Sequence, residues 1–177
     1  MITKKFLEFE GRSVNPQLLI RTAILADRVA IWGILEPVIR AGETYALPAD
    51  MSEADAIAYW MGPGREVFLA EQDGLVVGTY FLCANQKGGG DHVANAAYAT
   101  LPAMRGRGIA RGMAEHSLAE ARRRGFLAMQ YNFVVSSNAD AVHLWQSLGF
   151  EIVGRLPGAF RHPQLGPVDA LVMFRRL

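Results

Sequence analysis

The sequence contains little cysteine and no long apolar run, and both shortages narrow what the protein can be. Cys83 is the only cysteine among 177 residues, so an intramolecular disulfide is excluded and a reducing compartment is indicated. No apolar run approaches the roughly 18 residues that cross a bilayer. Glu8 and Glu10 also interrupt the N-terminus where a secretory signal would need an apolar stretch. We therefore expect a cytoplasmic protein that does not bind a membrane.

A dominant charge is also missing. The chain has 18 Lys and Arg against 17 Asp and Glu, a formal net charge of +1, so it offers no general basic field for nucleic acid. The three consecutive arginines Arg122, Arg123 and Arg124 fall at the expected end of a helix, where cations complement the helix dipole. Neither a His-Glu-x-x-His pattern nor clustered Cys and His occurs, so no metal site is expected.

The remaining composition, 51% hydrophobic and 20% charged, is that of a globular protein. A length of 177 residues suits one domain, to which we assign residues 1–177, with residues 1–16 as an N-terminal extension. Local patterns predict strands over residues 17–23, 66–71, 75–84, 92–101, 126–135, 150–156 and 168–175, and helices over residues 27–40, 54–61, 110–124 and 138–148. Pro37 is expected to break or kink the first helix, and residues 156–167, with three prolines, to form a loop. This order predicts a mixed α/β sheet flanked by helices.

Residues Arg105–Ala110 place two glycines and two arginines directly before an amphipathic helix. The first turn of a helix has backbone N–H groups without an intrahelical partner, so an anion fits there. Gly106 and Gly108 lack the Cβ atoms that would hold a phosphate away, while Arg105 and Arg107 add positive charge. Taken alone, the string also fits a glycine-rich turn with two solvated arginines. A nucleotide P-loop is excluded because no Gly-Lys-Ser or Gly-Lys-Thr occurs.

A second pattern decides between these interpretations. Residues 105–110 resemble motif A of the GNAT superfamily of acyl-CoA N-acyltransferases, with Arg105, Gly108 and Ala110 at the marked places. Residues 138–150 resemble the family's N-x-x-A-x-x-L-Y-x-x-x-G-F run, and every marked position agrees except Trp145, which replaces the tyrosine. Two linked motifs in the right order are far more specific than either alone.

The resemblance implies a mostly antiparallel sheet of about six to seven strands, with flanking helices and splayed fourth and fifth strands, here residues 92–101 and 126–135. It implies acetyl-CoA as co-substrate, with its arm in the gap between those strands and its pyrophosphate on the motif A loop. The residues expected to contact it are Ala99, Thr100, Leu101, Arg105, Gly106, Arg107, Gly108, Ile109, Ala110, Asn138, Ala141 and Trp145. Asn138 equally fits a helix N-cap.

Proton transfer is where the sequence departs from the family, because family enzymes often use the replaced tyrosine as general acid. An indole N–H cannot usefully give up a proton, yet a CoA thiolate, with a pKa of roughly 8.5, need not be protonated as it leaves. The candidate catalytic residues are Tyr98, His92 and Trp145, with Tyr131 as a second substitute acid and packing as the other role for these rings. Further candidates for the base are Asp91, Asn95, Glu36, His162 and Asp169, and a base acting through water is an alternative. Cys83 is expected to be buried and unreactive, and His116 and His143 to lie on the surface.

The expected function is N-acetyl transfer from acetyl-CoA to an amine of a small molecule, by direct attack in a ternary complex. Glu36, Tyr45 and Tyr131 are expected on the acceptor side, and residues 156–167 either close over the acceptor or form a homodimer contact. Two alternatives stay open: a sensor module that binds acyl-CoA without turnover, and an N-acetyltransferase of peptides or proteins. Nucleic acid is not expected as a partner.

Overall fold

The computed structural model describes residues 18–177, so the expected extension over residues 1–16 lies outside the described residues, as does Gln17 of the first expected strand. The strands are β1 (Leu19–Thr22), β2 (Glu66–Gln72), β3 (Leu75–Ala84), β4 (Val93–Thr100), β5 (Ala128–Val135), β6 (Glu151–His162) and β7 (Gly166–Arg176). The α-helices are α1 (Arg28–Ala41), α2 (Glu53–Trp60), α3 (Ile109–Arg123) and α4 (Ala139–Ser147), and short 3-10 turns cover Leu25–Asp27, Gly88–Gly90 and Pro102–Met104. The order of strands and helices is the one that the sequence predicts.

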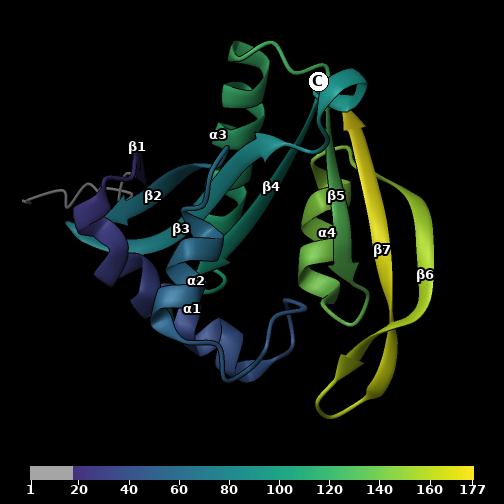
Figure 1. Cartoon of the computed structure of the whole chain (residues 1–177), viewed down its shortest axis with the longest axis horizontal. Helices are drawn as coiled ribbons and strands as arrows, with labels where there is room; N and C mark the ends of the chain where they lie inside the picture. Colours follow the sequence, from purple (N-terminus) through teal and green to yellow (C-terminus); the bar gives the residue numbers. More distant parts are fainter. Residues whose placement is uncertain (1–17) are drawn as a thin grey trace, which may run out of the picture.

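The strands form one seven-stranded sheet in the order β1-β2-β3-β4-β5-β7-β6 (Figure 1). Every neighbouring pair is antiparallel except β4 and β5, which run parallel and pair only at Val93 with Ala128 and at Ala94 with Met129. Beyond these residues the two strands diverge. The expected mixed, mostly antiparallel sheet with splayed fourth and fifth strands is therefore confirmed.

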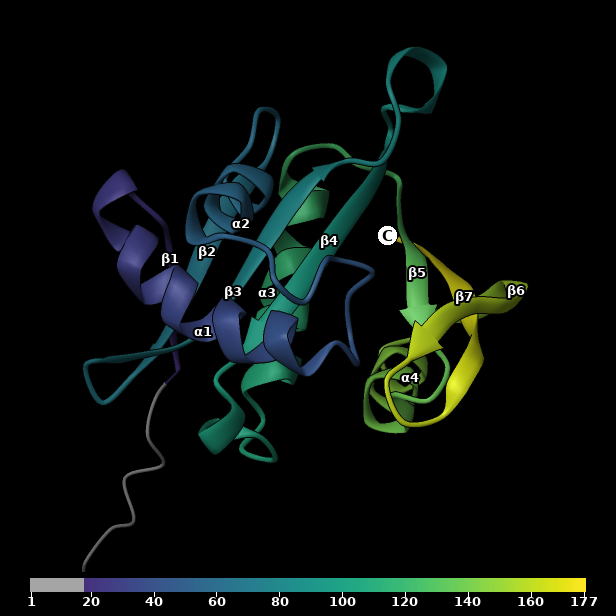
Figure 2. The same ribbon diagram turned by 60° about the horizontal axis from the view of Figure 1, so that its bottom comes forward.

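The helices cover the two faces of the sheet separately (Figure 2). α1 and α2 bury Ile31, Ile34 and Trp60 with side chains of β2 and β3 on one face. On the other face, α3 and α4 contribute Met113, Leu118 and Trp145 to a second cluster, together with side chains of β3, β4, β5 and β7. The α1–α2 layer therefore reaches as far as β4, whereas the layer of α3 and α4 contacts both β4 and β5.

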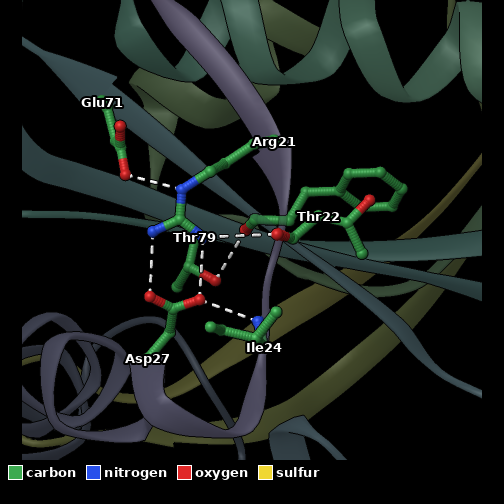
Figure 3. Close-up of polar contacts among 7 residues, drawn as sticks. Arg21, Thr22, Ile24, Asp27, Glu71 and Thr79 are labelled. Atoms are coloured by element: carbon green, nitrogen blue, oxygen red, sulfur yellow. Dashed lines mark hydrogen bonds and ion pairs between the residues drawn. The ribbon is translucent and has the colours of Figure 1, made fainter.

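The N-terminal strand is held to the sheet by charge as well as by pairing. Figure 3 shows the Arg21 guanidinium between two carboxylates. Its Nε donates to Glu71 at 2.8 Å, and its two terminal nitrogens donate to Asp27 at 2.8 and 2.9 Å. Asp27 also accepts the backbone N–H of Ile24 at 2.7 Å. These bonds tie β1, the turn before α1 and β2 into one unit.

Of the break or kink expected at Pro37, the break is wrong, because α1 runs unbroken from Arg28 to Ala41. A proline removes one backbone bond and leaves the carbonyl four residues earlier without its donor. That carbonyl belongs to Gly33, and both Gly33 and Pro37 are exposed, so water can hydrate it. Burial of Ile34, Leu35 and the other apolar residues on the opposite side keeps the helix intact.

The loop expected over residues 156–167 is also wrong, because β6 continues to His162 and β7 begins at Gly166. β6 is the edge strand of the sheet, where a proline costs little. Pro157 lies in the register shift between Leu156 and Phe160, so its missing N–H interrupts no regular pair. Within this register shift, the side chain of Asp169 links β7 to β6 by accepting the Gly158 N–H at 2.9 Å.

Candidate functional site

The loop before α3 presents unpaired backbone amides to open space. Gly106 and Gly108 have φ of 76° and 79°, left-handed values that glycine adopts without strain. A Cβ at either position would meet no atom within 4 Å. The first helical bond of this segment runs from the Gly112 N–H to the Gly108 carbonyl, so the amides in between have no helical partner.

No side chain caps the backbone amides at the start of α3, in contrast to α2 and α4. Ser52 caps α2 by accepting the Asp55 N–H, and Asn138 caps α4 by accepting the Ala141 N–H. α3 has no side-chain cap and no acidic residue in its first turn, and Arg105 and Arg107 are exposed beside it. Partial positive charge of the helix end and two guanidinium groups together favour an anion with several oxygens, such as a pyrophosphate.

Arg111 fixes how far α3 stands from α4. It donates from a terminal nitrogen to Ser147 Oγ at 2.8 Å and pairs with Glu115 one turn later at 3.7 Å. No local pattern indicates Arg111 or Ser147, because their link joins residues 36 positions apart.

The edge of β4 that faces β5 carries unpaired backbone groups. The Asn85 N–H donates to the Val93 carbonyl at 2.8 Å, and the Leu101 N–H donates to the Val77 carbonyl at 2.9 Å. Because hydrogen-bonding direction alternates along a strand, the odd-numbered residues of β4 point their backbone groups at β3. The even-numbered residues, Ala96, Tyr98 and Thr100, point theirs at β5, which has already diverged.

This alternation divides the backbone groups expected to contact acetyl-CoA. Thr100 presents its N–H and carbonyl to the gap, and Tyr98 presents its N–H, while the Tyr98 carbonyl on the same edge accepts a bond from Tyr45 Oη. Ala99 and Leu101 turn theirs toward β3, and the Leu101 N–H is already donated. An amide-rich chain lying in the gap can complete the ladder only with the even-numbered residues.

A chain of hydroxyl groups closes the α3 side of the gap. Tyr98 Oη lies 2.9 Å from Tyr131 Oη and 2.6 Å from Ser117 Oγ, and Ser117 Oγ lies 2.7 Å from the Ala114 carbonyl. A carbonyl only accepts, so Ser117 donates to it, Tyr98 donates to Ser117, and Tyr131 donates to Tyr98. Burial raises the pKa of Tyr98 to about 12 and that of Tyr131 well above its ordinary value.

This direction of donation limits what Tyr98 and Tyr131 can do. Both protons are committed inside the cluster, and the chain ends on a carbonyl that can neither take up nor release a proton. The geometry therefore favours packing over general-acid catalysis for both phenols. Neither the spacing of Ser117 nor its place on a helix indicated this role in the sequence.

Trp145 lies against both tyrosines. Its ring centroid is 5.0 Å from that of Tyr98 and 4.9 Å from that of Tyr131, and the residue is buried. Phe150 stacks on Tyr131 at 4.3 Å and also meets the Trp145 ring edge-on, at 6.4 Å between centroids. The Trp145 indole is thus part of the hydrophobic core beneath the gap, which agrees with the packing role considered for it. Asn138 uses its amide oxygen to cap α4, which leaves its amide nitrogen unused by the cap.

Tyr45 reaches β4 from the other face of the sheet. It follows α1, and its Oη donates to the Tyr98 carbonyl at 2.5 Å, on the edge that faces the gap. Its ring packs edge-on against Trp60 at 6.0 Å. Arg40 holds the same loop in place by donating to the carbonyls of Ala49 and Met51. The loop after α1 is therefore docked onto the gap.

The candidate bases are spread over the molecule. His92 is exposed just before β4, at the end where β4 and β5 are still paired, and its carbonyl accepts the Leu127 N–H. Glu36 lies on α1 and pairs with Arg40 at 3.6 Å. The other candidates, Asp91, Asn95, His162 and Asp169, lie in the turn before β4, on β4, at the end of β6 and on β7.

His162 and Asp169 have structural partners. His162 Nδ1 accepts the backbone N–H groups of Gln164 and Leu165, which places the ring proton on Nε2. Asp169 pairs with Arg155 at 2.7 Å, and this guanidinium lowers the pKa of the carboxyl. Both side chains hold the β6–β7 hairpin together.

Two expectations about reactive side chains need correction. His116 is not a surface residue: it is half-buried on α3, its Nδ1 lies 2.6 Å from Tyr80 Oη, and burial lowers its pKa. Cys83 is half-buried rather than fully buried, and burial raises the pKa of its thiol. His143 is exposed, as expected.

The described part of the chain contains neither a cluster of metal-ligating side chains nor a helix that could span a membrane. Among residues 18–177, no three or more His, Cys, Asp or Glu side chains gather where they could hold a metal ion. None of the helices within that range is long and apolar enough to cross a membrane.

Comparison with known proteins identifies the family. The sequence profile of the acetyltransferase (GNAT) family matches residues 35–150. The N-acetyltransferase aca1 of Schizosaccharomyces pombe is 31% identical over 151 residues, which cover 76% of this chain and 72% of that protein. A GCN5-related N-acetyltransferase from Kribbella flavida superposes with a TM-score of 0.86 at 41% identity, over 90% of this chain and 98% of that one.

A third relative links the same fold to its ligand. The structure of yncA from Salmonella typhimurium, solved with its cofactor acetyl-CoA, superposes with a TM-score of 0.79 at 24% identity, over 91% of this chain and 94% of that one. At that identity the likeness supports the shared fold. Together with the matching family profile, these similarities establish that the chain belongs to the GNAT family of acetyltransferases and is an N-acetyltransferase.

Proposed function

We propose that the protein transfers the acetyl group of acetyl-CoA to a primary or secondary amine of a small molecule, by direct attack while both substrates are bound. The observation that carries the proposal is the alignment of two sets of unpaired backbone groups. The amides at the start of α3 and the free edge of β4 follow one another along the chain and open onto the same gap.

The residues present fit acetyl-CoA. Gly106 and Gly108 leave open space over the α3 amides for a pyrophosphate, with Arg105 and Arg107 beside it. Ile109 and Ala110 belong to the same turn, and Asn138 and Ala141 begin the neighbouring helix α4. When bound, acetyl-CoA supplies an activated thioester carbonyl and a thiolate that can leave.

The protein's part in the chemistry is positioning and backbone electrostatics. The N–H groups of Tyr98 and Thr100 point into the gap, where either can stabilise negative charge developing on the carbonyl oxygen. Tyr45, Tyr98 and Tyr131 all donate their hydroxyl protons within the protein, so none is assigned as general acid. A thiolate with a pKa of roughly 8.5 can depart without one.

The two strands that flank the gap are polar in part but carry no charge. Neither β4 nor β5 carries a charged residue, and Gln130, Asn132 and Asn85 form a chain of carboxamides with bonds of 2.7 and 2.6 Å. No carboxylate on these strands would hold the acceptor as an ammonium ion. The amine is therefore proposed to react in its neutral form, which is the nucleophilic one.

Contacts around this side favour a small acceptor. Tyr45 docks the loop after α1 onto β4, and Glu36 lies on α1 one turn before Arg40. From the other direction, the β6–β7 turn brings Pro163 beside Gly42, so that a Cβ on Gly42 would lie 3.7 Å from it. Segments on both sides bound the approach to β4, which suits a small molecule better than a folded protein.

The experiment incubates the protein with acetyl-CoA and a panel of amino acids, polyamines, aminoglycosides and peptides, and follows free thiol release and product mass. Acetylation of a small amine supports the proposal. Acetyl-CoA binding without turnover of any amine would replace it with the sensor function, and turnover of peptides alone would replace the acceptor class. The expected cytoplasmic location and homodimer stay predictions, and light scattering tests the dimer.

A further inference from the structure

The gap between β4 and β5 is closed at its narrow end by aromatic rings rather than left as an open slot. Tyr98 lies four residues beyond the last paired residue of β4, and Tyr131 lies two beyond that of β5. Their hydroxyl groups meet at 2.9 Å, so the two side chains span the divergence. Trp145 packs against both rings from α4.

These rings lie on the face of the sheet that α3 and α4 cover. Ala94, Ala96, Met129 and Tyr131 pack in the same cluster as the α3 side chains, and Tyr98 packs against it. A chain that starts at the α3 loop and follows the free edge of β4 passes Thr100 first and then Tyr98. Its far end therefore arrives at the rings of Tyr98 and Trp145.

The rings are held from four elements, so they cannot easily give way. Tyr98 is anchored to α3 through Ser117 at 2.6 Å, and Tyr131 contacts both Trp145 and Phe150, which also contact each other. Trp145 and Tyr131 are both less than a tenth exposed. Enlarging the group that abuts a packed cluster requires rotamer and backbone shifts, which are costly.

We propose that Tyr98, Tyr131 and Trp145 form the end wall of the acyl site and restrict the donor to acetyl-CoA or an acyl-CoA of similar length. This inference rests on the proposed placement of acetyl-CoA and adds the residues that select its acyl group. Each added methylene would have to displace a ring from the cluster. Replacing Trp145 by alanine removes the largest of the three side chains that form the end wall and opens room beneath the gap.

The test measures binding without an acceptor amine. Dissociation constants of CoA, acetyl-CoA, butyryl-CoA and hexanoyl-CoA are compared by calorimetry for wild type, Trp145→Ala and Trp32→Ala. Trp32→Ala removes the same side chain from α1, on the opposite face, as a matched control. Wild type and Trp32→Ala should bind hexanoyl-CoA roughly tenfold to hundredfold more weakly than acetyl-CoA. Trp145→Ala should bring the two constants within about threefold of each other.

The outcomes separate this inference from the proposed function. Equal binding of acetyl-CoA and hexanoyl-CoA by wild type would overturn the end wall while leaving acetyl transfer intact, and needs no variant. A Trp145→Ala protein that folds and keeps the wild-type preference would overturn the role of Trp145; Trp145→Leu serves if the alanine variant does not fold. Failure to bind CoA at all would instead overturn the proposed donor site.

Discussion

Gly108 allows a sharp test of the proposed pyrophosphate site, because the same helix offers a matched control at its other end. Gly108 precedes α3 at a φ of 79°, Gly125 follows it at a φ of 85°, and a Cβ at either would meet no atom within 4 Å. Alanine at either position should cost about 1–2 kcal/mol of folding free energy through left-handed backbone strain. Gly108→Ala and Gly125→Ala should therefore lose similar stability.

Their affinities for acetyl-CoA should differ. Only at Gly108 would the new methyl group project into the space proposed for the pyrophosphate. Loss of one charge-assisted hydrogen bond from the α3 amides costs about 1.5–3 kcal/mol, which corresponds to a roughly 10-fold to 150-fold rise in Kd. Gly125→Ala should bind acetyl-CoA as wild type does.

Calorimetry gives the Kd of each variant, and thermal unfolding gives the loss of stability. The reasoning is refuted if Gly108→Ala binds acetyl-CoA with wild-type affinity. It is also refuted if both variants weaken binding equally, because the effect would then come from strain in α3 and not from the loop.

Three further outcomes follow from the contacts. Tyr98→Phe should change kcat less than tenfold. The pH profile of the rate should stay that of wild type, with the rate rising as the acceptor amine loses its proton. Loss or shift of one limb of this profile would identify Tyr98 as a general acid. Tyr45→Phe loses the bond to the Tyr98 carbonyl. In steady-state kinetics it should raise KM for the amine by about fivefold, and in calorimetry it should change the Kd of acetyl-CoA little. A raised Kd of acetyl-CoA with an unchanged KM for the amine would contradict the place of Tyr45 on the acceptor side. Asp27→Asn should cost about 1 kcal/mol at pH 7, because its hydrogen bonds with Arg21 lower the pKa of Asp27. A carboxyl with a lowered pKa stabilises the fold above its unfolded pKa and loses this effect as pH falls through the folded one. The difference in Tm should therefore begin to shrink as pH falls below about 3.9 and vanish below the lowered folded pKa. A difference that persists in stronger acid would exclude the ion pair as its cause.

Local signals were enough for most of the fold. The Ser52 cap, the glycines around α3 and the Asp73-Gly74 turn between β2 and β3 each act within a few residues, so the sequence predicts them directly. The two errors concern proline. Whether Pro37 breaks α1 depends on which side of the helix faces water, and whether Pro157 ends β6 depends on whether that strand lies at the edge of the sheet. Tertiary packing sets both.

The site divides in the same way. The loop at Gly106 and Gly108 could be predicted because a motif of adjacent residues forms it. The free edge of β4 follows only from pairing with β3 on one side and divergence from β5 on the other. The donation from Tyr98 to Ser117 joins residues 19 positions apart, and no pattern in the sequence announces it. A catalytic role for Tyr98 therefore stays a prediction, which the Tyr98→Phe variant tests.

The central claim is acetyl transfer to a small amine, and single-turnover mass spectrometry tests it most directly. Protein loaded with acetyl-CoA labelled in its acetyl group is mixed with the amine panel, and the label is followed. The account predicts that the label moves to one or a few small amines and that CoA is released in equal amount. Label that stays on CoA while the protein binds it tightly, or that moves only to peptides, would contradict the account.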